Sequence, residues 1–171
     1  MSYVTLTIIC LFALLVRTGY EQLKLRGIVK PENRIAVAII FAFMMALWAS
    51  WFGLCPEDPL PLDLPDPLRW LGLGLVILGL ILALTALGQL RGVENIDHLV
   101  TTGLFARLRH PMYAGFILWV VGWILYHGAG ASIAPGSLII ANVFYWAGLE
   151  DAHLRVKFGA AYEEYRKQTW F

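Results

Sequence analysis

Five apolar stretches constrain the fold of this chain more than any other feature, because charged residues fall only between them or at their ends. A helix needs about 20 apolar residues to cross a membrane, and about 17 are tolerated. The second, third and fifth stretches reach that length. The sequence therefore predicts an all-α integral membrane protein with about five transmembrane helices. The stretches cover residues 3–16, 35–54, 68–90, 112–126 and 131–149.

The composition supports this conclusion and excludes other classes of protein. Of the 171 residues, 59% are hydrophobic and only 15% are charged, too few charges to cover the surface of a soluble domain. A net charge of +1 gives no electrostatic reason to expect a nucleic-acid partner. We expect a single membrane domain over residues 1–171, with the first two spans in 1–54 and the remainder in 68–171.

Two of the five stretches are short. The first reaches spanning length only if the Arg17 side chain extends to the membrane surface and Tyr20 lies at the interface. The fourth is separated from the fifth by a segment that contains Gly128, Gly130 and Pro135. This spacing predicts that the last two helices form a tight hairpin, either spanning or partly re-entrant.

Basic residues alternate from one connecting segment to the next, which predicts the orientation. The segment before the second stretch, the segment before the fourth and the C-terminal tail are basic, whereas the proline-rich segment 55–67 is acidic and is expected to be an extended external loop. The positive-inside rule then places the N-terminus outside and the C-terminus in the cytoplasm. We expect the inner membrane of a bacterium or archaeon. Arg69 is the single basic residue between the second and third stretches, and the basic residues of the other segments are Arg17, Lys24, Arg26, Lys30, Arg34, Arg91, Arg107, Arg109, Arg155, Lys157, Arg166 and Lys167.

The first polar cluster on the cytoplasmic side begins the fourth helix. Pro111 fixes its own φ and disfavours helix at His110, so we expect it in the first turn. The free N–H groups of that turn, with Arg109 and His110, would form a positive pocket, and Tyr113 follows on the same turn. The alternative is that Arg109 and His110 contact lipid headgroups and that Tyr113 is an interfacial anchor.

The second polar cluster is an acid pair, Glu150 and Asp151, at the end of the fifth stretch. Carboxylates at a helix C-terminus oppose the helix dipole unless they have a partner. In an antiparallel hairpin, Arg109 and His110 could be that partner. Beyond the pair, Gly159 is expected to cap the helix, and a short cytoplasmic helix follows it.

That final helix has two expected faces. Tyr162 and Tyr165 share one of them, while Glu163 and Lys167 form an exposed i,i+4 pair on the other.

These two clusters together resemble the isoprenylcysteine carboxyl methyltransferase family, whose wider relatives are membrane phospholipid methyltransferases. The resemblance covers about residues 86–166. The first motif is Arg109-His110-Pro111-x-Tyr113-x-Gly115, preceded by Leu99-Val100-Thr101-x-Gly103. The second is the acid pair followed by Leu154, Phe158-Gly159, Tyr162 and Tyr165.

The resemblance implies transfer of a methyl group from S-adenosyl-L-methionine to a lipophilic acceptor, with residues 68–171 forming the third span and the cofactor-binding catalytic part. It implies that five residues bind the cofactor or close its pocket and that three of them, Arg109, His110 and Glu150, are catalytic. Membrane lipids and a lipid-linked acceptor would be the partners. The five residues are Arg109, His110, Tyr113, Glu150 and Asp151.

The acceptor stays open at this point. Members of the family that methylate prenylcysteine carry basic residues just before the acid pair, where this chain has Phe144, Tyr145 and Trp146. An apolar thiol, an amine-bearing lipid and a lipid carboxylate are all compatible acceptors. An amine would need a base, for which His110 is the nearest candidate.

Other functions are weighed against this one. One alternative is a phospholipid N-methyltransferase, and another is a non-catalytic membrane scaffold or binding protein with the same fold. A haem or quinone carrier would need two histidines facing each other within the spans, whereas the four histidines lie at the ends of the stretches. We expect no metal site.

One further motif, Gly72-Leu73-Gly74, is comparable to the glycine-x-glycine element of phospholipid methyltransferases. Our topology places it near the outer end of the third helix, roughly 24–27 Å from the cytoplasmic pocket at 1.5 Å per residue. We expect these glycines, with Gly79 and Ala83, to allow close packing of helices.

Overall fold

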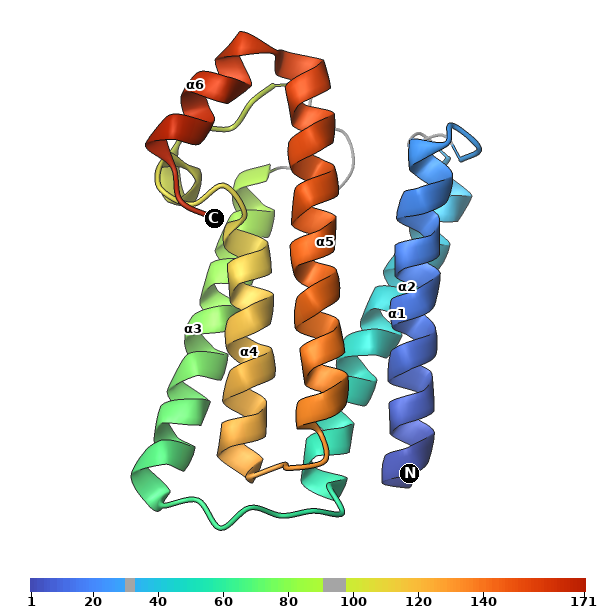
Figure 1. Cartoon of the computed structure of the whole chain (residues 1–171), viewed down its shortest axis with the longest axis vertical. Coiled ribbons are helices and arrows are strands. Elements are labelled where there is room, and N and C mark those ends of the chain that lie inside the picture. The colour runs from blue at the N-terminus through green and yellow to red at the C-terminus, as the bar shows by residue number, and fades with distance from the viewer. Residues whose placement is uncertain (30–32, 91–97) are drawn as a thin grey trace.

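The computed structural model describes residues 1–29, 33–90 and 98–171, and within these its regular structure is helical. Lys30 and Arg91, which entered the prediction of orientation, lie outside the described residues. Figure 1 shows the long helices side by side, with the C-terminal helix beyond one end of the bundle. The elements are α1 (Tyr3–Leu25), α2 (Arg34–Leu54), η1 (Cys55–Glu57), α3 (Asp66–Leu90), η2 (Gly103–Ala106), α4 (Pro111–His127), α5 (Ile133–Phe158) and α6 (Ala160–Gln168).

Three of these helices are long and apolar enough to cross a membrane, and α4 is a shorter apolar helix. The prediction of a helical integral membrane protein is confirmed, while the number of five spans stays a prediction. The first helix differs from expectation because it continues to Leu25. Arg17 lies inside α1 and pairs with Glu21 one turn further on.

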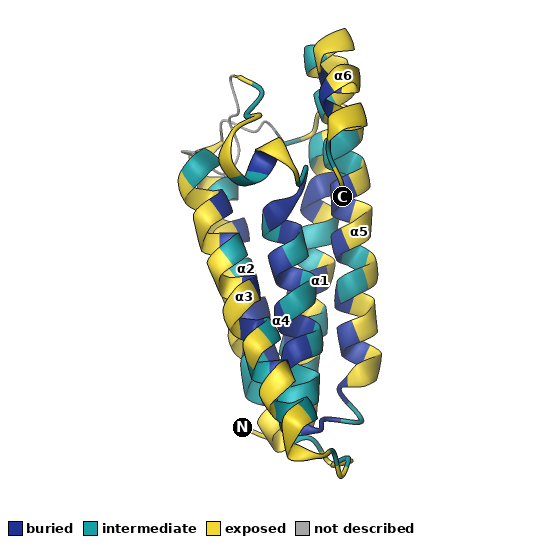
Figure 2. Cartoon of the chain, turned by 90° about the vertical axis from the view of Figure 1, so that its left-hand side faces the viewer, coloured by how far each residue is buried: buried dark blue, intermediate teal, exposed yellow. Residues whose placement is uncertain are grey.

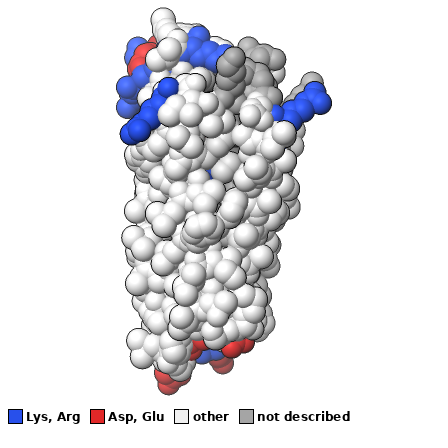
Figure 3. All heavy atoms as spheres, turned by 90° about the vertical axis from the view of Figure 1, so that its right-hand side faces the viewer, with Lys and Arg blue, Asp and Glu red and all other residues white. Residues whose placement is uncertain are grey.

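The charges lie at the two ends of the bundle. Figure 3 shows mostly lysine and arginine, with some acidic atoms, at the end that carries α6, mostly acidic residues at the opposite end, and almost only uncharged side chains between them. The acidic end includes the loop between α2 and α3, and the basic end includes the loop between α1 and α2. Connecting segments that alternate between basic and acidic along the sequence thus lie at opposite ends of the bundle.

The acidic loop holds the turn between α4 and α5 in place. The Asp58 carboxylate accepts hydrogen bonds from the backbone N–H groups of Ala131 (3.1 Å) and Ser132 (2.7 Å) at the start of α5. Next to it, the Gly130 N–H donates to the carbonyl of Leu60. The predicted extended loop is present from residue 58, after the single turn η1, and the predicted hairpin of α4 and α5 is confirmed (Figure 1).

Glycines allow α3 and α4 to pack almost backbone to backbone. A methyl group at Gly79 would lie 2.5 Å from the Gly115 carbonyl oxygen, and one at Gly72 would lie 2.6 Å from the Gly122 carbonyl oxygen. Ala83 completes the contact against Gly115. The prediction of close packing is therefore confirmed for Gly72, Gly79 and Ala83, whereas Gly74 faces open space.

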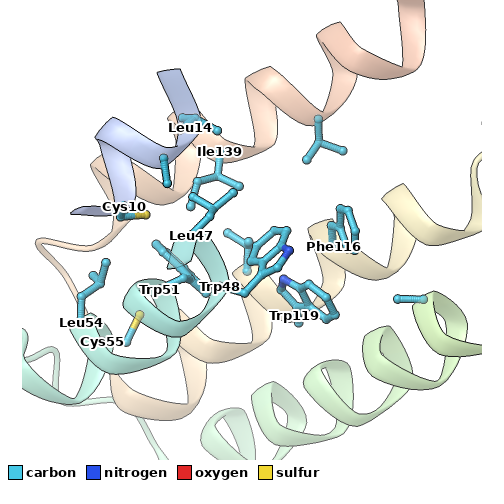
Figure 4. Close-up of a cluster of buried hydrophobic side chains, with 14 of the residues drawn as sticks. Cys10, Leu14, Leu47, Trp48, Trp51, Leu54, Cys55, Phe116, Trp119 and Ile139 are labelled. Atoms are coloured by element: carbon cyan, nitrogen blue, oxygen red, sulfur yellow. The ribbon is translucent and has the colours of Figure 1, made fainter. Parts of the chain in front are cut away.

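The apolar core lies where α1 and α2 meet the α4–α5 hairpin (Figure 4). Trp51 is fully buried, and Trp48 packs against Phe116 and Trp119 with ring centroids 4.8 and 4.6 Å apart. Figure 2 shows buried and intermediate residues along α4, with none exposed, and α3 exposed along its outer face. This arrangement places the start of α4 among other helices, at the end of the bundle that carries α6.

We expect Gly79→Ala to destabilise the protein by about 1–3 kcal/mol, because the added methyl group would force α3 away from α4. Gly74→Ala is the matched control in the same helix, and it should be neutral or slightly stabilising because alanine favours helix and meets no neighbour. Thermal unfolding in detergent, followed by circular dichroism, would measure both. Equal melting temperatures for the two variants would contradict the packing described here.

Candidate active site

The start of α4 is set by its proline. Pro111 occupies the first turn, and the preceding residue His110 has a non-helical backbone with φ −123° and ψ 58°. The N–H groups of Arg109 and His110 donate to the carbonyls of Trp170 (2.9 Å) and Phe171 (3.0 Å). The C-terminal segment thus lies alongside the entry to α4, and the His110 side chain is directed into the bundle, only 5% exposed.

The acid pair lies within a helix. The prediction that it lies at the end of a helix is wrong. Helix α5 continues two turns beyond Asp151 to Phe158, and Gly159 caps it at φ 53°, a conformation that favours glycine. Glu150 and Asp151 are therefore free of the unfavourable helix-end dipole that we expected. Their positions depend on the same rigid helix that forms the last apolar stretch.

The two clusters meet at His110. Its Nε2 lies 2.7 Å from Asp151 Oδ1, and its Nδ1 lies 3.6 Å from Glu150 Oε2. The Tyr162 hydroxyl on α6 donates to the same Asp151 oxygen. The predicted contact between the two halves of the hairpin is present, and α6 joins it.

Protonation of this cluster follows from its contacts. Burial alone would lower the pKa of His110, but hydrogen bonds to Asp151 and Glu150 and the charges of both raise it to about 9. Burial opposes ionisation of Asp151, yet hydrogen bonds from His110 and Tyr162 lower its pKa to about 2. Burial and the hydrogen bond to Asp151 raise the pKa of Tyr162. At neutral pH, His110 is therefore an imidazolium bound to a carboxylate.

Arg109 binds the C-terminal segment and has one further N–H donor that makes no hydrogen bond with the described residues. One guanidinium nitrogen donates to the carbonyls of Thr169 (2.8 Å) and Arg166 (3.2 Å). Its Nε is buried without a hydrogen-bond partner among the described residues and lies 4.0 Å from Asp151 Oδ1. A surface depression of about 350 Å³ adjoins it, lined by Arg109, Glu163, Arg166 and Lys167.

Aromatic rings enclose the cluster on the side facing the core. Tyr113 stacks on His110 with ring centroids 5.6 Å apart. Phe171 packs edge-on to His110 at 5.9 Å and to Phe144 at 5.3 Å. All five residues predicted for the site thus lie together. These rings exclude water from one side of the cluster.

Residues of α6 and the C-terminal segment complete the site, and the sequence analysis did not include them among the site residues. Tyr162 and Tyr165 share the buried face of α6, as predicted, and the Tyr165 hydroxyl donates to the carbonyl of Phe105 at 2.7 Å. The i,i+3 spacing of the two tyrosines could have indicated that Tyr162 belongs to the site. No local pattern indicated Phe171, because its contact with His110 spans most of the C-terminal half of the chain.

The predicted pair of Glu163 and Lys167 is absent. Glu163 pairs with Arg155 of α5 at 2.9 Å, and Lys167 pairs with Glu164 at 3.1 Å. The turn at Gly159 brings the exposed face of α6 towards α5, so a cation on the neighbouring helix reaches Glu163 first. Both side chains are exposed, so their assignment to the surface was correct.

The site residues also fit the methionine part of S-adenosyl-L-methionine. The unpartnered Nε of Arg109 is a donor suited to a carboxylate. The Glu150 side chain is one-third exposed, at 33%, and its 3.6 Å contact with His110 leaves room to accept hydrogen bonds from an ammonium group. Arg109 and Glu150 carry opposite charges, which complement the carboxylate and the ammonium group of the cofactor.

Comparisons with known proteins agree with the motifs. The family model for phospholipid methyltransferase matches residues 68–161. A protein-S-isoprenylcysteine O-methyltransferase of Schizosaccharomyces pombe is 40% identical over 78 residues, which cover 44% of this chain and 33% of that protein. Protein-S-isoprenylcysteine O-methyltransferase B of Arabidopsis thaliana is 32% identical over 113 residues, covering 57% and 55%.

A probable protein-S-isoprenylcysteine O-methyltransferase of Oryza sativa is 32% identical over 77 residues, covering 44% of this chain and 40% of that protein. The matches therefore span between a third and just over half of the length of these relatives. The relatives are eukaryotic and give no support to the predicted bacterial or archaeal membrane. No solved structure matches the chain significantly.

The raised pKa of His110 predicts that the protein loses stability in alkaline solution. Its charged form is favoured in the folded state, so its contribution is fully present below about pH 6.5 and is lost as the pH rises through about 9. Thermal unfolding of the protein between pH 6 and 9.5 would show a falling melting temperature. In His110→Gln that fall should be much smaller, and equal slopes for both proteins would contradict the assignment.

Proposed function

Because this chain belongs to the phospholipid methyltransferase family, we propose that it is a membrane-embedded methyltransferase that uses S-adenosyl-L-methionine and a lipophilic acceptor. The observation that carries the proposal is the meeting of Arg109, His110 and the acid pair at one end of the bundle, where the buried Arg109 Nε has no hydrogen-bond partner among the described residues. The family match covers the helices that build this site, α3 to α5.

Each polar residue has a distinct task in this proposal. Arg109 Nε would bind the carboxylate of the cofactor, and Glu150 would bind its ammonium group. Asp151 holds His110 and Tyr162 in place, so it positions the pocket wall. Tyr113 and Phe171 exclude water from the reacting end.

The reaction requires little of the protein beyond aligning the acceptor with the methyl group. When bound, the cofactor supplies an electrophilic methyl group on a sulfonium, and its displacement neutralises charge. The state of His110 bears on the acceptor. An imidazolium held by Asp151 retains its proton at neutral pH, so it is poorly suited to take a proton from an amine or a thiol.

An acceptor that reacts without losing a proton fits this site best, and a carboxylate is such an acceptor. The relatives named protein-S-isoprenylcysteine O-methyltransferase support the same choice. We propose a lipophilic acid as the acceptor and a phospholipid amine as the alternative. By the positive-inside rule, the site faces the cytoplasm and the N-terminus lies outside.

Titration of the detergent-purified protein with S-adenosylhomocysteine by calorimetry tests the cofactor site. We expect saturable binding, weakened about 10- to 100-fold in Glu150→Gln and in Arg109→Ala, because each removes one charge-assisted hydrogen bond. Size-exclusion chromatography and circular dichroism would show that the variants are folded.

The matched control for this titration is Glu164→Gln. Glu164 is an acid at the same end of the molecule, but it is exposed, contacts Lys167 and Gln168 of its own helix, and does not line the depression beside Arg109. Its affinity should equal that of the original protein. Absence of binding by the folded original protein would contradict the proposed function and favour a non-catalytic membrane protein.

A further inference from the structure

Residues 169–171 lie along the entry to α4 in an extended conformation, and we name them the C-terminal strap. The carbonyl groups of Trp170 and Phe171 accept hydrogen bonds from the N–H groups of Arg109 and His110. Figure 1 shows this end of the chain beside the turn that leads into α4. The strap is thus attached to the site by backbone hydrogen bonds and is not part of a helix.

The two aromatic side chains of the strap point in opposite directions. Successive side chains of an extended segment alternate between its two sides. Trp170 is 78% exposed, whereas the Phe171 ring packs against the apolar core and lies 5.9 Å from the ring of His110. Phe171 is therefore the residue whose side chain brings the strap into contact with the site.

The Phe171 ring also reaches the surface that faces lipid in the predicted topology. It packs edge-on to Phe144, with ring centroids 5.3 Å apart, and Phe144 is 53% exposed within the last apolar stretch. Phe144 precedes Asp151 by seven residues, so the two lie on one side of α5, about 10.5 Å apart along its axis. Phe171 consequently lies between a ring exposed to lipid and the histidine that binds Asp151.

Phe171 is also the most easily moved of the rings around the site. Tyr113 lies within α4 and Phe144 lies within α5, so a long helix holds each of them in place. The strap follows α6, which is anchored separately by the hydroxyl groups of Tyr162 and Tyr165. Rotation of the Phe171 side chain would therefore uncover the site without any movement of a helix.

Displacement of this ring favours apolar molecules over water. A phenyl ring carries no polar atom, and lipid chains are as apolar as the side chains of a protein core. The hydrocarbon chain of a ligand can therefore replace the contacts of the ring at little cost in free energy. Water beside the same apolar surface would be unfavourable. The chemistry of the ring thus suits a gate that opens to lipid.

From these contacts we propose that Phe171 is a specificity-determining residue that acts as a gate between lipid and His110, and that it admits molecules whose apolar chain displaces its ring. This inference rests on the proposed function, because it concerns how a lipophilic acceptor reaches the site. In the closed position, which the structure shows, the ring lies between Phe144 and His110. In the open position, the chain of the acceptor takes its place beside Phe144, and the reacting end reaches His110.

Photolabelling in proteoliposomes tests the gate. A fatty alcohol with a diazirine in its chain labels the groups that lipid chains reach, and mass spectrometry of peptides locates the label. The original protein should be labelled at Phe144 and only weakly on the peptide that carries His110. Phe171→Ala should raise labelling of the His110 peptide about tenfold or more, because an open state populated at about 0.1–10% becomes permanent. Labelling at Phe144 should change little.

Trp170→Ala is the matched control. It removes the neighbouring ring of the strap, which is exposed, and it keeps the backbone hydrogen bonds. Labelling of the His110 peptide should equal that of the original protein. An increase as large as that in Phe171→Ala would mean that the whole strap loosens, and would overturn the role of Phe171. Unchanged labelling in Phe171→Ala would overturn it as well.

A water-soluble probe separates a gate to lipid from a barrier against water. A free amino acid that carries a diazirine is a zwitterion and stays in water. It should label the His110 peptide equally weakly in the original protein and in Phe171→Ala. Stronger labelling by this probe in Phe171→Ala would mean that the ring only excludes water or that the site has loosened, and would overturn the inference.

Titration of the same samples with S-adenosylhomocysteine keeps this inference distinct from the proposed function. Binding by the original protein without the expected difference in labelling would overturn the gate and leave the methyltransferase proposal intact. The expected difference in labelling without binding by the folded original protein would count against the proposed function. It would still establish that Phe171 controls access from lipid to His110.

Discussion

The contact between His110 and Asp151 is the interaction on which the rest of the site depends. It joins the residue that precedes α4 to the part of α5 nearest α6, and the Tyr162 hydroxyl of α6 donates to the same carboxylate oxygen. Three helices are therefore fixed to one another by one ionised carboxylate. Because the histidine is buried, the pair is stable only while both partners are charged.

The close approach of α3 and α4 makes that contact possible. With glycine at the crossing points, α4 lies against α3 at backbone distance, and His110, which precedes α4, is buried. At the other end, Asp58 fixes the start of α5 through backbone N–H groups. The hairpin is thus held at both ends, and the acid pair faces His110 with little freedom to move.

Local patterns in the sequence were sufficient for much of this fold. Pro111, the glycines of α3 and the proline-rich loop each restrict the backbone by themselves, so their consequences could be predicted. Gly159 likewise predicted where α5 ends. The interpretation of the acid pair as a helix end was wrong, because charged residues mark the end of an apolar stretch and not the end of a helix. The contact of Phe171 with His110 depends on which segments face each other, a property that no local spacing encodes. The i,i+4 spacing of Arg17 and Glu21 in α1, in contrast, could have indicated their ion pair.

The unbroken length of α5 fixes the distance between the acid pair and the opposite end of the bundle. Its 26 residues extend about 39 Å, roughly 9 Å more than the hydrocarbon core of a bilayer. In the predicted topology, in which α5 spans the bilayer, the excess matches the turns beyond Glu150, and this rigid helix sets the height of the acid pair above the opposite membrane face. Bilayer thickness, and not loop motion, would then set how far the reacting end of a lipid must move along the membrane normal to reach the acid pair. The rate of the reaction would consequently differ between thin and thick membranes.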